Sequence, residues 1–285
     1  MAYSLRQVKS RIKGVEGIKK LTRAMEMVSS AKLRPLQKSL YVSREYGLRI
    51  ERITDNLLTS FGGINDELLV PARQVKSVLL CCITSDSGLC AAYNTNIIRA
   101  AEAFINKNSG KKISLFVIGR KGLNHFRRKG FNISGQRAEL FGHYSAELAD
   151  GLTKDLIGAF TIKAADEVYI AYSKIISASK IIPSVEKLLN IEPVPGERIE
   201  YLVEPDAPTL IKELLPLYLK AKIRSILLSA FVSENSIRVM AMHEATTNAK
   251  SLLDGLLIQR NKMRQAQITG ELIEVISGAT ALKGQ

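Results

Sequence analysis

Residues Arg238 to Leu282 read RVMAMHEATTNAKSLLDGLLIQRNKMRQAQITGELIEVISGATAL. This stretch contains no proline, and its small or apolar side chains return at three- and four-residue steps. The stripe consists of Ala245, Ala249, Leu252, Leu256, Met263 and Ala266. Such spacing predicts a helix with one apolar face that packs along another helix. At about 1.5 Å per residue this helix is roughly 60 Å long, so it needs a partner of similar length.

The N-terminal end of the chain provides that partner. Its apolar stripe also repeats at three and four residues, and comprises Leu5, Val8, Ile12, Val15, Ile18, Leu21, Met25 and Val28. The same pattern continues to Leu57 and ends near Phe61-Gly62-Gly63. Pro35 interrupts it, and a bend is expected there because proline removes an amide donor and clashes with the preceding turn. Each long helix has one apolar side, so we predict that the two ends pair as an antiparallel coiled coil.

The middle of the chain has a different pattern. Continuous apolar runs at Val75–Thr84, Lys112–Gly119 and Asp166–Ser173 are typical of strands buried on both faces. Residues 131–135 suit a further short strand, and helical segments lie between the runs, which predicts an α/β domain with a mainly parallel sheet. The proline-punctuated segment from Ile181 onward is interpreted as a connection back to the last helix. Pro208 and Pro216 place the start of that helix between Thr209 and Leu217.

The predicted fold is therefore an α/β body inserted between two long terminal helices that form an antiparallel coiled coil. The predicted domains are an N-terminal shaft helix at residues 1–62, a globular Rossmann-like domain at 73–205 and a C-terminal shaft helix at 208–285.

The composition and net charge of the chain indicate which kinds of partner it could bind. The chain has 285 residues, of which 46% are hydrophobic and 24% charged, and it contains no run of about 18 apolar residues that would span a membrane. Its N-terminus lacks an apolar signal core. Cys81, Cys82 and Cys90 lie in one segment and are expected to stay reduced. The net charge of +14 implies an acidic partner, which could be nucleic acid, an anionic membrane surface or acidic protein loops.

The sequence offers few groups for catalysis. It has no Gly-rich phosphate-binding motif after any strand. The turn Thr84–Leu89 could hold an anion at the next helix N-terminus, although Asp86 would repel it. The histidines His125, His143 and His243 lack metal-ligand spacing, and Cys90 has no evident base. We therefore expect no catalytic, cofactor or metal site.

Several blocks of the sequence resemble the gamma subunit of F-type ATP synthases. Lys19–Arg34 (KKLTRAMEMVSSAKLR) is similar to that family's N-terminal shaft helix, and SDSGLCAAYN to its Asp-Arg-Gly-Leu-Cys-Gly-Gly turn. Ile118–Gly122 (IGRKG), Tyr201–Asp206 (YLVEPD) and two blocks of the last helix, RVMAMHEATTNA and RQAQITGELIEVISGA, also match. Ser87 departs from the pattern where the family has arginine, and Ala91-Ala92 where it has two glycines.

The resemblance implies a central stalk without bond chemistry of its own. The paired helices would turn inside a ring of alpha and beta subunits, and rotation would couple proton or sodium flow through the membrane rotor to ATP synthesis or hydrolysis. It implies contacts with the beta subunits at Lys20, Met25, Arg264, Gln265 and Gln267. Tyr201 and Glu204 match positions at the rotor-ring end.

The implied partners are the alpha, beta and epsilon subunits and the membrane c-ring. The implied location is the cytoplasmic face of the bacterial inner membrane, as a peripheral subunit, with no homo-oligomer. Two other classes of function remain open. A nucleic-acid-binding coiled coil would explain the basic helix, but Tyr3 is the only aromatic residue up to Arg34. A small-molecule enzyme on the α/β body would require nucleotide binding by the isolated chain.

Overall fold

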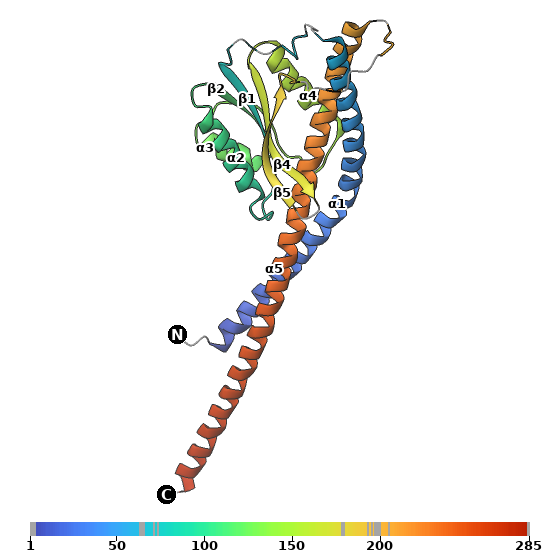
Figure 1. Cartoon of the computed structure of the whole chain (residues 1–285). Coiled ribbons are helices and arrows are strands. Elements are labelled where there is room, and N and C mark those ends of the chain that lie inside the picture. Colours follow the sequence, from blue (N-terminus) through green and yellow to red (C-terminus); the bar gives the residue numbers. More distant parts are fainter. Residues whose placement is uncertain are drawn as a thin grey trace. The chain divides into compact units, whose positions relative to one another are not determined.

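The computed structural model describes residues 4–62, 66–70, 72, 74–177, 180–192, 194, 196, 201–204 and 206–283, with side chains up to residue 279. Gly63 and the predicted domain ends at residues 1, 73, 205 and 285 lie outside the described residues. The elements in chain order are α1 (Leu5–Phe61), β1 (Ser77–Ile83), α2 (Tyr93–Lys107), β2 (Lys112–Ile118), α3 (Arg120–Arg128), β3 (Ile133–Arg137), α4 (Ala146–Thr161), β4 (Glu167–Ser177), β5 (Lys180–Leu189) and α5 (Ala207–Lys283) (Figure 1).

The expected α/β body and long terminal helices are confirmed. The sheet has the order β3-β2-β1-β4-β5, in which the first four strands are parallel and β5 is antiparallel. The central strand β1 pairs Cys81 with Phe116 of β2 and with Ile170 of β4. Because β1 is covered on both faces, six of its seven residues are buried, and this explains its continuous apolar run.

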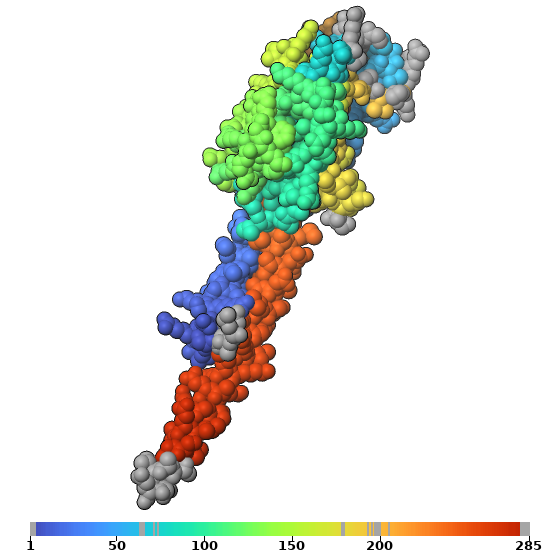
Figure 2. Space-filling model, turned by 90° about the vertical axis from the view of Figure 1, so that its left-hand side faces the viewer, coloured from blue at the N-terminus to red at the C-terminus, as the bar shows by residue number. Residues whose placement is uncertain are grey.

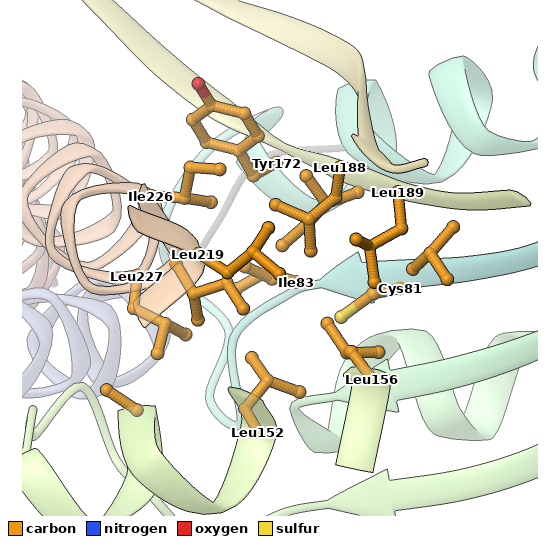
Figure 3. Packing of buried hydrophobic residues seen from close by; sticks show 14 of the residues in the cluster. Cys81, Ile83, Leu152, Leu156, Tyr172, Leu188, Leu189, Leu219, Ile226 and Leu227 are labelled. Carbon is orange, nitrogen blue, oxygen red and sulfur yellow. The ribbon is translucent and has the colours of Figure 1, made fainter. Parts of the chain in front are cut away.

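Alternate residues of β1 enter two separate hydrophobic clusters. Cys81 and Ile83 pack against Leu152 and Leu156 of α4 and against apolar residues of α1 and α5, including Leu219 (Figure 3). The side chains from the other face, among them Leu80 and Cys82, pack against α2 and α3. The sheet is therefore a layer between α2 with α3 on one side and α4 with parts of α1 and α5 on the other.

The chain divides into two compact units. The shaft unit comprises Met1–Val28 and Val239–Gln285, and the body unit comprises Ser29–Arg238. Both long helices contribute residues to each unit. α1 stays continuous through Pro35, so a bend at that residue remains a prediction. It ends at Phe61, where Gly62 has a positive φ of 41° and donates its amide to the Leu58 carbonyl, a common helix ending.

The apolar stripe predicted on α1 is wrong at Ile18, Leu21, Val28 and Ile53, whereas its later members Leu36, Leu40 and Leu57 are buried as predicted. Ile18, Leu21 and Val28 are 55%, 59% and 56% exposed, whereas Thr22 and Ser29 are buried. The buried positions on α1 keep the alternating four- and three-residue spacing of Val8, Ile12 and Val15. At Thr22 and Ser29 the buried side chains at this spacing are polar. Positions that recur every seven residues stay on the side of a helix that faces its partner. Polar side chains therefore occupy the interface between the two helices (the seam), while nearby apolar side chains lie outside it.

The same kind of correction applies to α5. Leu252 is 45% exposed and its neighbour Leu253 is 9% exposed, so Leu253 lies in the seam instead of Leu252. Ala266 is also exposed. Ala249 and Leu256 are buried as predicted. Adjacent leucines cannot be distinguished by hydrophobicity, and only the register of the partner helix selects one of them.

Two further expectations about the segment after β4 are wrong. The predicted connection contains β5, in which Pro183 pairs with Ser173. Proline is tolerated because β5 is an edge strand of the sheet. The last helix begins at Ala207, earlier than expected, because Asp206 accepts a hydrogen bond from the Thr209 amide (2.8 Å) as an N-terminal cap. No helix in the described ranges is long and apolar enough to cross a bilayer.

Candidate partner-binding surfaces

The shaft unit is held by a small apolar seam between α1 and α5. Val8, Ile12 and Val15 of α1 pack with Leu253 and Leu256 of α5, among others. Figure 2 shows the blue N-terminal residues of this unit against the orange and red residues of α5. Buried aliphatic side chains at alternating three- and four-residue steps are typical of coiled-coil packing.

Polar contacts fix the direction of this pairing. Thr246 donates its hydroxyl to the Thr22 hydroxyl at 2.8 Å, and the His243 ring lies 3.2 Å from the Glu26 carboxylate. Moving from Thr22 to Glu26 along α1 therefore means moving from Thr246 back to His243 along α5. The two helices are antiparallel. The hydrogen bond with His243 is the main cause that lowers the pKa of Glu26 below its usual 4.5.

The exposed side of α1 in the shaft unit is strongly basic. Between residues 4 and 28 it has seven Lys or Arg side chains and two Glu. Arg23 pairs with Glu26 at 3.1 Å. Lys9, Lys13 and Lys20 form no ion pair with any described residue, so their charges face solvent or a partner. An acidic surface would therefore meet this helix favourably.

Two of the sequence-predicted contact residues lie on this part of α1. Lys20 is exposed and lines a groove of about 490 Å³ together with Glu16, Arg23, Thr246 and others. Met25 is half-buried and lies within one helical turn of the polar seam residues. The structure thus brings Lys20 and Met25 onto one stretch of the shaft.

The other three predicted contact residues of the shaft lie on α5, where α1 has no facing residue. Extending the pairing of Thr22 with Thr246 brings Leu5, at the start of α1, level with Met263. Arg264, Gln265 and Gln267 follow directly and are exposed. Gln267 donates to Glu271 on the same helix at 2.9 Å. About 16 residues of helix, roughly 24 Å, separate this group from Lys20.

Exposed apolar side chains accompany these polar residues on the unpaired part of α5. Their exposed fractions lie between 48% and 69%, and the residues are Ile268, Leu272, Ile273, Val275 and Ile276. A helix with this much exposed apolar surface is typical of a segment that another protein surrounds.

Tyr201 and Glu204 lie in the body unit, away from regular structure. The Tyr201 hydroxyl accepts a hydrogen bond from the Asn56 side-chain amide at 3.2 Å. Glu204 is exposed, and Leu202 beside it is 98% exposed. These residues form an exposed segment that is anchored to α1 through Tyr201.

The turn after β1 is joined to the start of α3 by hydrogen bonds. The Asp86 carboxylate accepts four backbone amides, including that of Arg120 at the start of α3. The next α3 amides are also used, since Lys121 donates to the Ser85 carbonyl and Gly122 to the Thr84 hydroxyl. The first amides of α3 therefore already have partners within the chain. The helix that follows this turn directly is α2, and an anion at its N-terminus stays a prediction.

The structure shows the surroundings of Ser87 and the backbone conformations of Ala91 and Ala92, the residues of this turn that differ from the family pattern. Ser87 accepts a hydrogen bond from Arg238 at 3.0 Å. Ala91 has a φ of +45°, in the left-handed region that favours glycine, whereas Ala92 has an ordinary φ of −84°. Of the two usual glycines, only the first occupies a position that strains alanine.

Two of the three histidines considered for chemistry have acidic partners in the structure. His125 lies 2.8 Å from Glu102 and His243 lies 3.2 Å from Glu26, two partners that sequence spacing could not reveal. The three cysteines are free and buried, and burial raises the pKa of Cys82 to about 12. No three His, Cys, Asp or Glu side chains gather as metal ligands within the described part of the chain.

These features define an α/β protein whose two chain ends pair as a basic, antiparallel coiled-coil shaft. A family model described as ATP synthase matches residues 4–282. An ATP synthase gamma chain from Pelotomaculum thermopropionicum is 36% identical over 98% of this chain and 99% of its own length. The chain belongs to the ATP synthase gamma chain family.

Solved structures share the fold. A chain of the Euglena gracilis mitochondrial ATP synthase superposes with a TM-score of 0.68 at 16% identity, covering 98% of this chain and 94% of its own. A chain from the central stalk and c-ring of the Tetrahymena thermophila mitochondrial ATP synthase has a TM-score of 0.60 at 20% identity, covering 79% and 99%. At these identities the likeness concerns the fold alone.

Proposed function

We propose that this chain is the central-stalk rotor subunit of an F-type ATP synthase. The observation that carries the proposal is the antiparallel pairing of both chain ends into a shaft, in a member of the gamma chain family. A helix pair can transmit torque because each helix resists the bending and untwisting of the other. The unpaired part of α5, with its exposed apolar residues, would enter the ring of alpha and beta subunits.

The basic side of α1 would face acidic loops of the beta subunits. Lys20 is positioned for such a contact, and Met25 lies close by without adding charge. Exposed ion pairs contribute only about 0–1 kcal/mol each, so contacts of this kind guide a turning shaft without locking it in one orientation. Arg264, Gln265 and Gln267 would contact a beta-subunit loop further along α5.

The exposed segment with Tyr201 and Glu204 would contact the membrane c-ring end of the rotor, with the epsilon subunit beside it. Ion flow, of protons or sodium, would then turn the c-ring and this chain together. Each beta subunit would meet a different face of the shaft in turn, and its nucleotide affinity would change accordingly. ATP synthesis and hydrolysis would take place in the alpha/beta ring, and this chain would have no catalytic site.

The chain would accordingly be a peripheral subunit at the cytoplasmic face of the bacterial inner membrane, without nucleic acid or a second copy of itself as partner. The division into domains at 1–62, 73–205 and 208–285 stays a prediction. This division separates the two helices that would form the shaft from the α/β body between them.

The test compares two methionines on α1. Met25→Lys and Met27→Lys each add one positive charge to the same helix, but Met27 is 60% exposed and lies on another side of α1. Each variant is assembled into the complete complex, and ATP-driven ion pumping is measured per ATP hydrolysed. We expect Met25→Lys to lower this ratio several-fold while the complex stays assembled, because a new ion pair would hold one orientation too tightly.

Met27→Lys should leave the ratio close to that of the wild type. An unchanged ratio in assembled Met25→Lys complexes would contradict the proposed contact. Equal losses in both variants would indicate a general effect of charge on α1. Failure of the wild-type chain to assemble with alpha and beta subunits would contradict the proposed function itself.

A further inference from the structure

Four charged side chains from three distant segments meet at one place in the body unit. They are Lys32 on α1, Asp86 in the turn after β1, and Glu234 and Arg238 on α5. Two are acidic and two are basic, so the cluster is neutral. Lys32 is close in sequence to Ser29, the first residue of the body unit, and Arg238 is its last residue.

Asp86 organises the loop that follows β3. Its Oδ1 accepts the amides of Arg120 (2.9 Å) and Glu139 (3.0 Å), and its Oδ2 accepts those of Leu140 (2.6 Å) and Phe141 (2.8 Å). Asp86 is only 8% exposed. Hydrogen bonds to an ionised acceptor are about twice as strong as neutral ones, so this carboxylate holds residues 139–141 firmly.

The same loop holds α1. Lys32 donates from its Nζ to the Phe141 carbonyl at 2.9 Å. Phe141 therefore receives a hydrogen bond at its carbonyl from α1 and donates its amide to Asp86. One residue connects the helix to the turn after β1.

Arg238 connects the turn to the other helix. Its Nη2 donates to Glu234 at 2.7 Å and to the Ser87 hydroxyl at 3.0 Å, and its Nε lies 3.4 Å from the Gly88 carbonyl. The side chains of Arg238 and Glu234 are 6% and 2% exposed. Burial raises the pKa of Glu234, and the charge of Arg238 opposes that rise. A buried pair of this kind is costly to break because the remaining charge has no water around it.

The loop also packs directly on α5. A Cβ added at Gly142, whose φ is +71°, would lie 3.2 Å from the Asn235 side-chain nitrogen. Several non-glycine residues in the two loops have a positive φ, namely Leu89, Ala91, Glu139 and Phe141. Such backbone conformations cost free energy and persist only where surrounding contacts impose them, and they are concentrated at functional sites.

We propose that Asp86 and Arg238 are positioning residues of a latch that fixes both terminal helices to the α/β domain where they leave the body unit. The latch consists of Lys32, Asp86, Ser87, Phe141, Glu234 and Arg238. Its role in torque transmission rests on the proposed rotor function. Under that function, a twist applied to α1 and α5 passes to the sheet through these contacts, which join both helices to one rigid turn.

The latch predicts a mechanical effect that a purely stabilising contact would not have. Asp86→Asn removes the charge that holds residues 139–141, and Arg238→Lys keeps the charge but loses the forked contact with Glu234 and Ser87. The matched control is Arg137→Gln, which breaks an exposed ion pair with Asp155 in the same domain.

The first measurement uses the full isolated chain. Hydrogen exchange of the Glu139, Leu140 and Phe141 amides should become about tenfold faster in Asp86→Asn, since each loses a charged acceptor, and should not change in Arg137→Gln. Unchanged protection of these amides in Asp86→Asn would overturn the latch. This readout does not depend on the chain being a rotor.

The second measurement uses assembled complexes. The torsional stiffness of the stalk is obtained from the angular fluctuations of a probe attached to the α/β domain while the alpha/beta ring is held. Stiffness should fall at least about twofold in Asp86→Asn and Arg238→Lys and stay at the wild-type value in Arg137→Gln. If the amides exchange faster in Asp86→Asn but the stalk keeps its stiffness, the cluster only stabilises the fold. That result would overturn the positioning role.

Discussion

The register of the shaft predicts different effects for two adjacent leucines on α5. Leu253 is 9% exposed and lies in the seam, whereas Leu252 is 45% exposed. Leu→Ala removes three carbons worth about 0.8 kcal/mol each when buried, so Leu253→Ala should cost roughly 2 kcal/mol and Leu252→Ala about 1 kcal/mol. Helix propensity does not affect the comparison, because both variants make the same change on the same helix.

Hydrogen exchange of the full chain measures this difference locally. The amides to follow are those of Ile12 and Val15, which lie on α1 in the same apolar seam. A difference of about 1 kcal/mol makes these amides exchange roughly five times faster in Leu253→Ala than in Leu252→Ala. Equal effects, or a larger effect from Leu252→Ala, would refute the register.

Three more substitutions test the α/β body by denaturation of the full chain. Ala91→Gly should stabilise it by about 0.5–1 kcal/mol, because glycine relieves the strain of a φ of +45°, and a lower denaturation midpoint would contradict this. Gly119→Ala should destabilise it by more than about 2 kcal/mol, since a Cβ would overlap the Thr84 carbonyl; a wild-type midpoint would refute that overlap. The pKa of Asp166 lies below 3.8, chiefly through the Ser77 amide, so its ionised form stabilises the fold above that pH and the contribution disappears as pH falls through the folded pKa. In Asp166→Asn the free energy of unfolding should therefore fall less between neutral and acidic pH than in the wild type. An equal fall in both proteins would contradict this role of the Asp166 carboxylate.

The elements that could be predicted from sequence are those with a strong local pattern. β1 is an apolar run because both of its faces are covered, and the long helices repeat every seven residues. β5 is not predicted because Pro183 suggests a connection, although an edge strand tolerates proline. The early start of α5 depends on the side chain of Asp206, a local signal that the prolines obscured.

The polar seam could not be predicted in the same way. Thr22 faces Thr246 because the register of two helices demands it, while Ile18 and Leu21 lie outside the seam. Hydrophobicity alone selects the wrong residues wherever polar side chains occupy the repeat. An acidic partner for His243 became visible only once this register placed Glu26 beside it.

The contacts of the latch cannot be predicted from sequence. Lys32 and Phe141 are 109 positions apart, and Ser87 and Arg238 are 151 positions apart. No periodicity or spacing connects such residues. The net charge predicts only an acidic partner, whereas the rotor function rests on the resemblance of several blocks to one family.

A disulfide between α1 and α5 tests whether both chain ends turn as one shaft. Thr22 and Thr246 have their hydroxyl oxygens 2.8 Å apart, so cysteines at both positions should be close enough to bond, and the native cysteines are buried. The measurement is ion pumping per ATP by assembled complexes carrying Thr22→Cys and Thr246→Cys, before and after oxidation. If both chain ends turn as one shaft, the disulfide forms within one chain and the oxidised complex pumps as well as the reduced one. Absence of the disulfide, or a loss of pumping that a reductant reverses, would show that the two ends do not turn as one shaft.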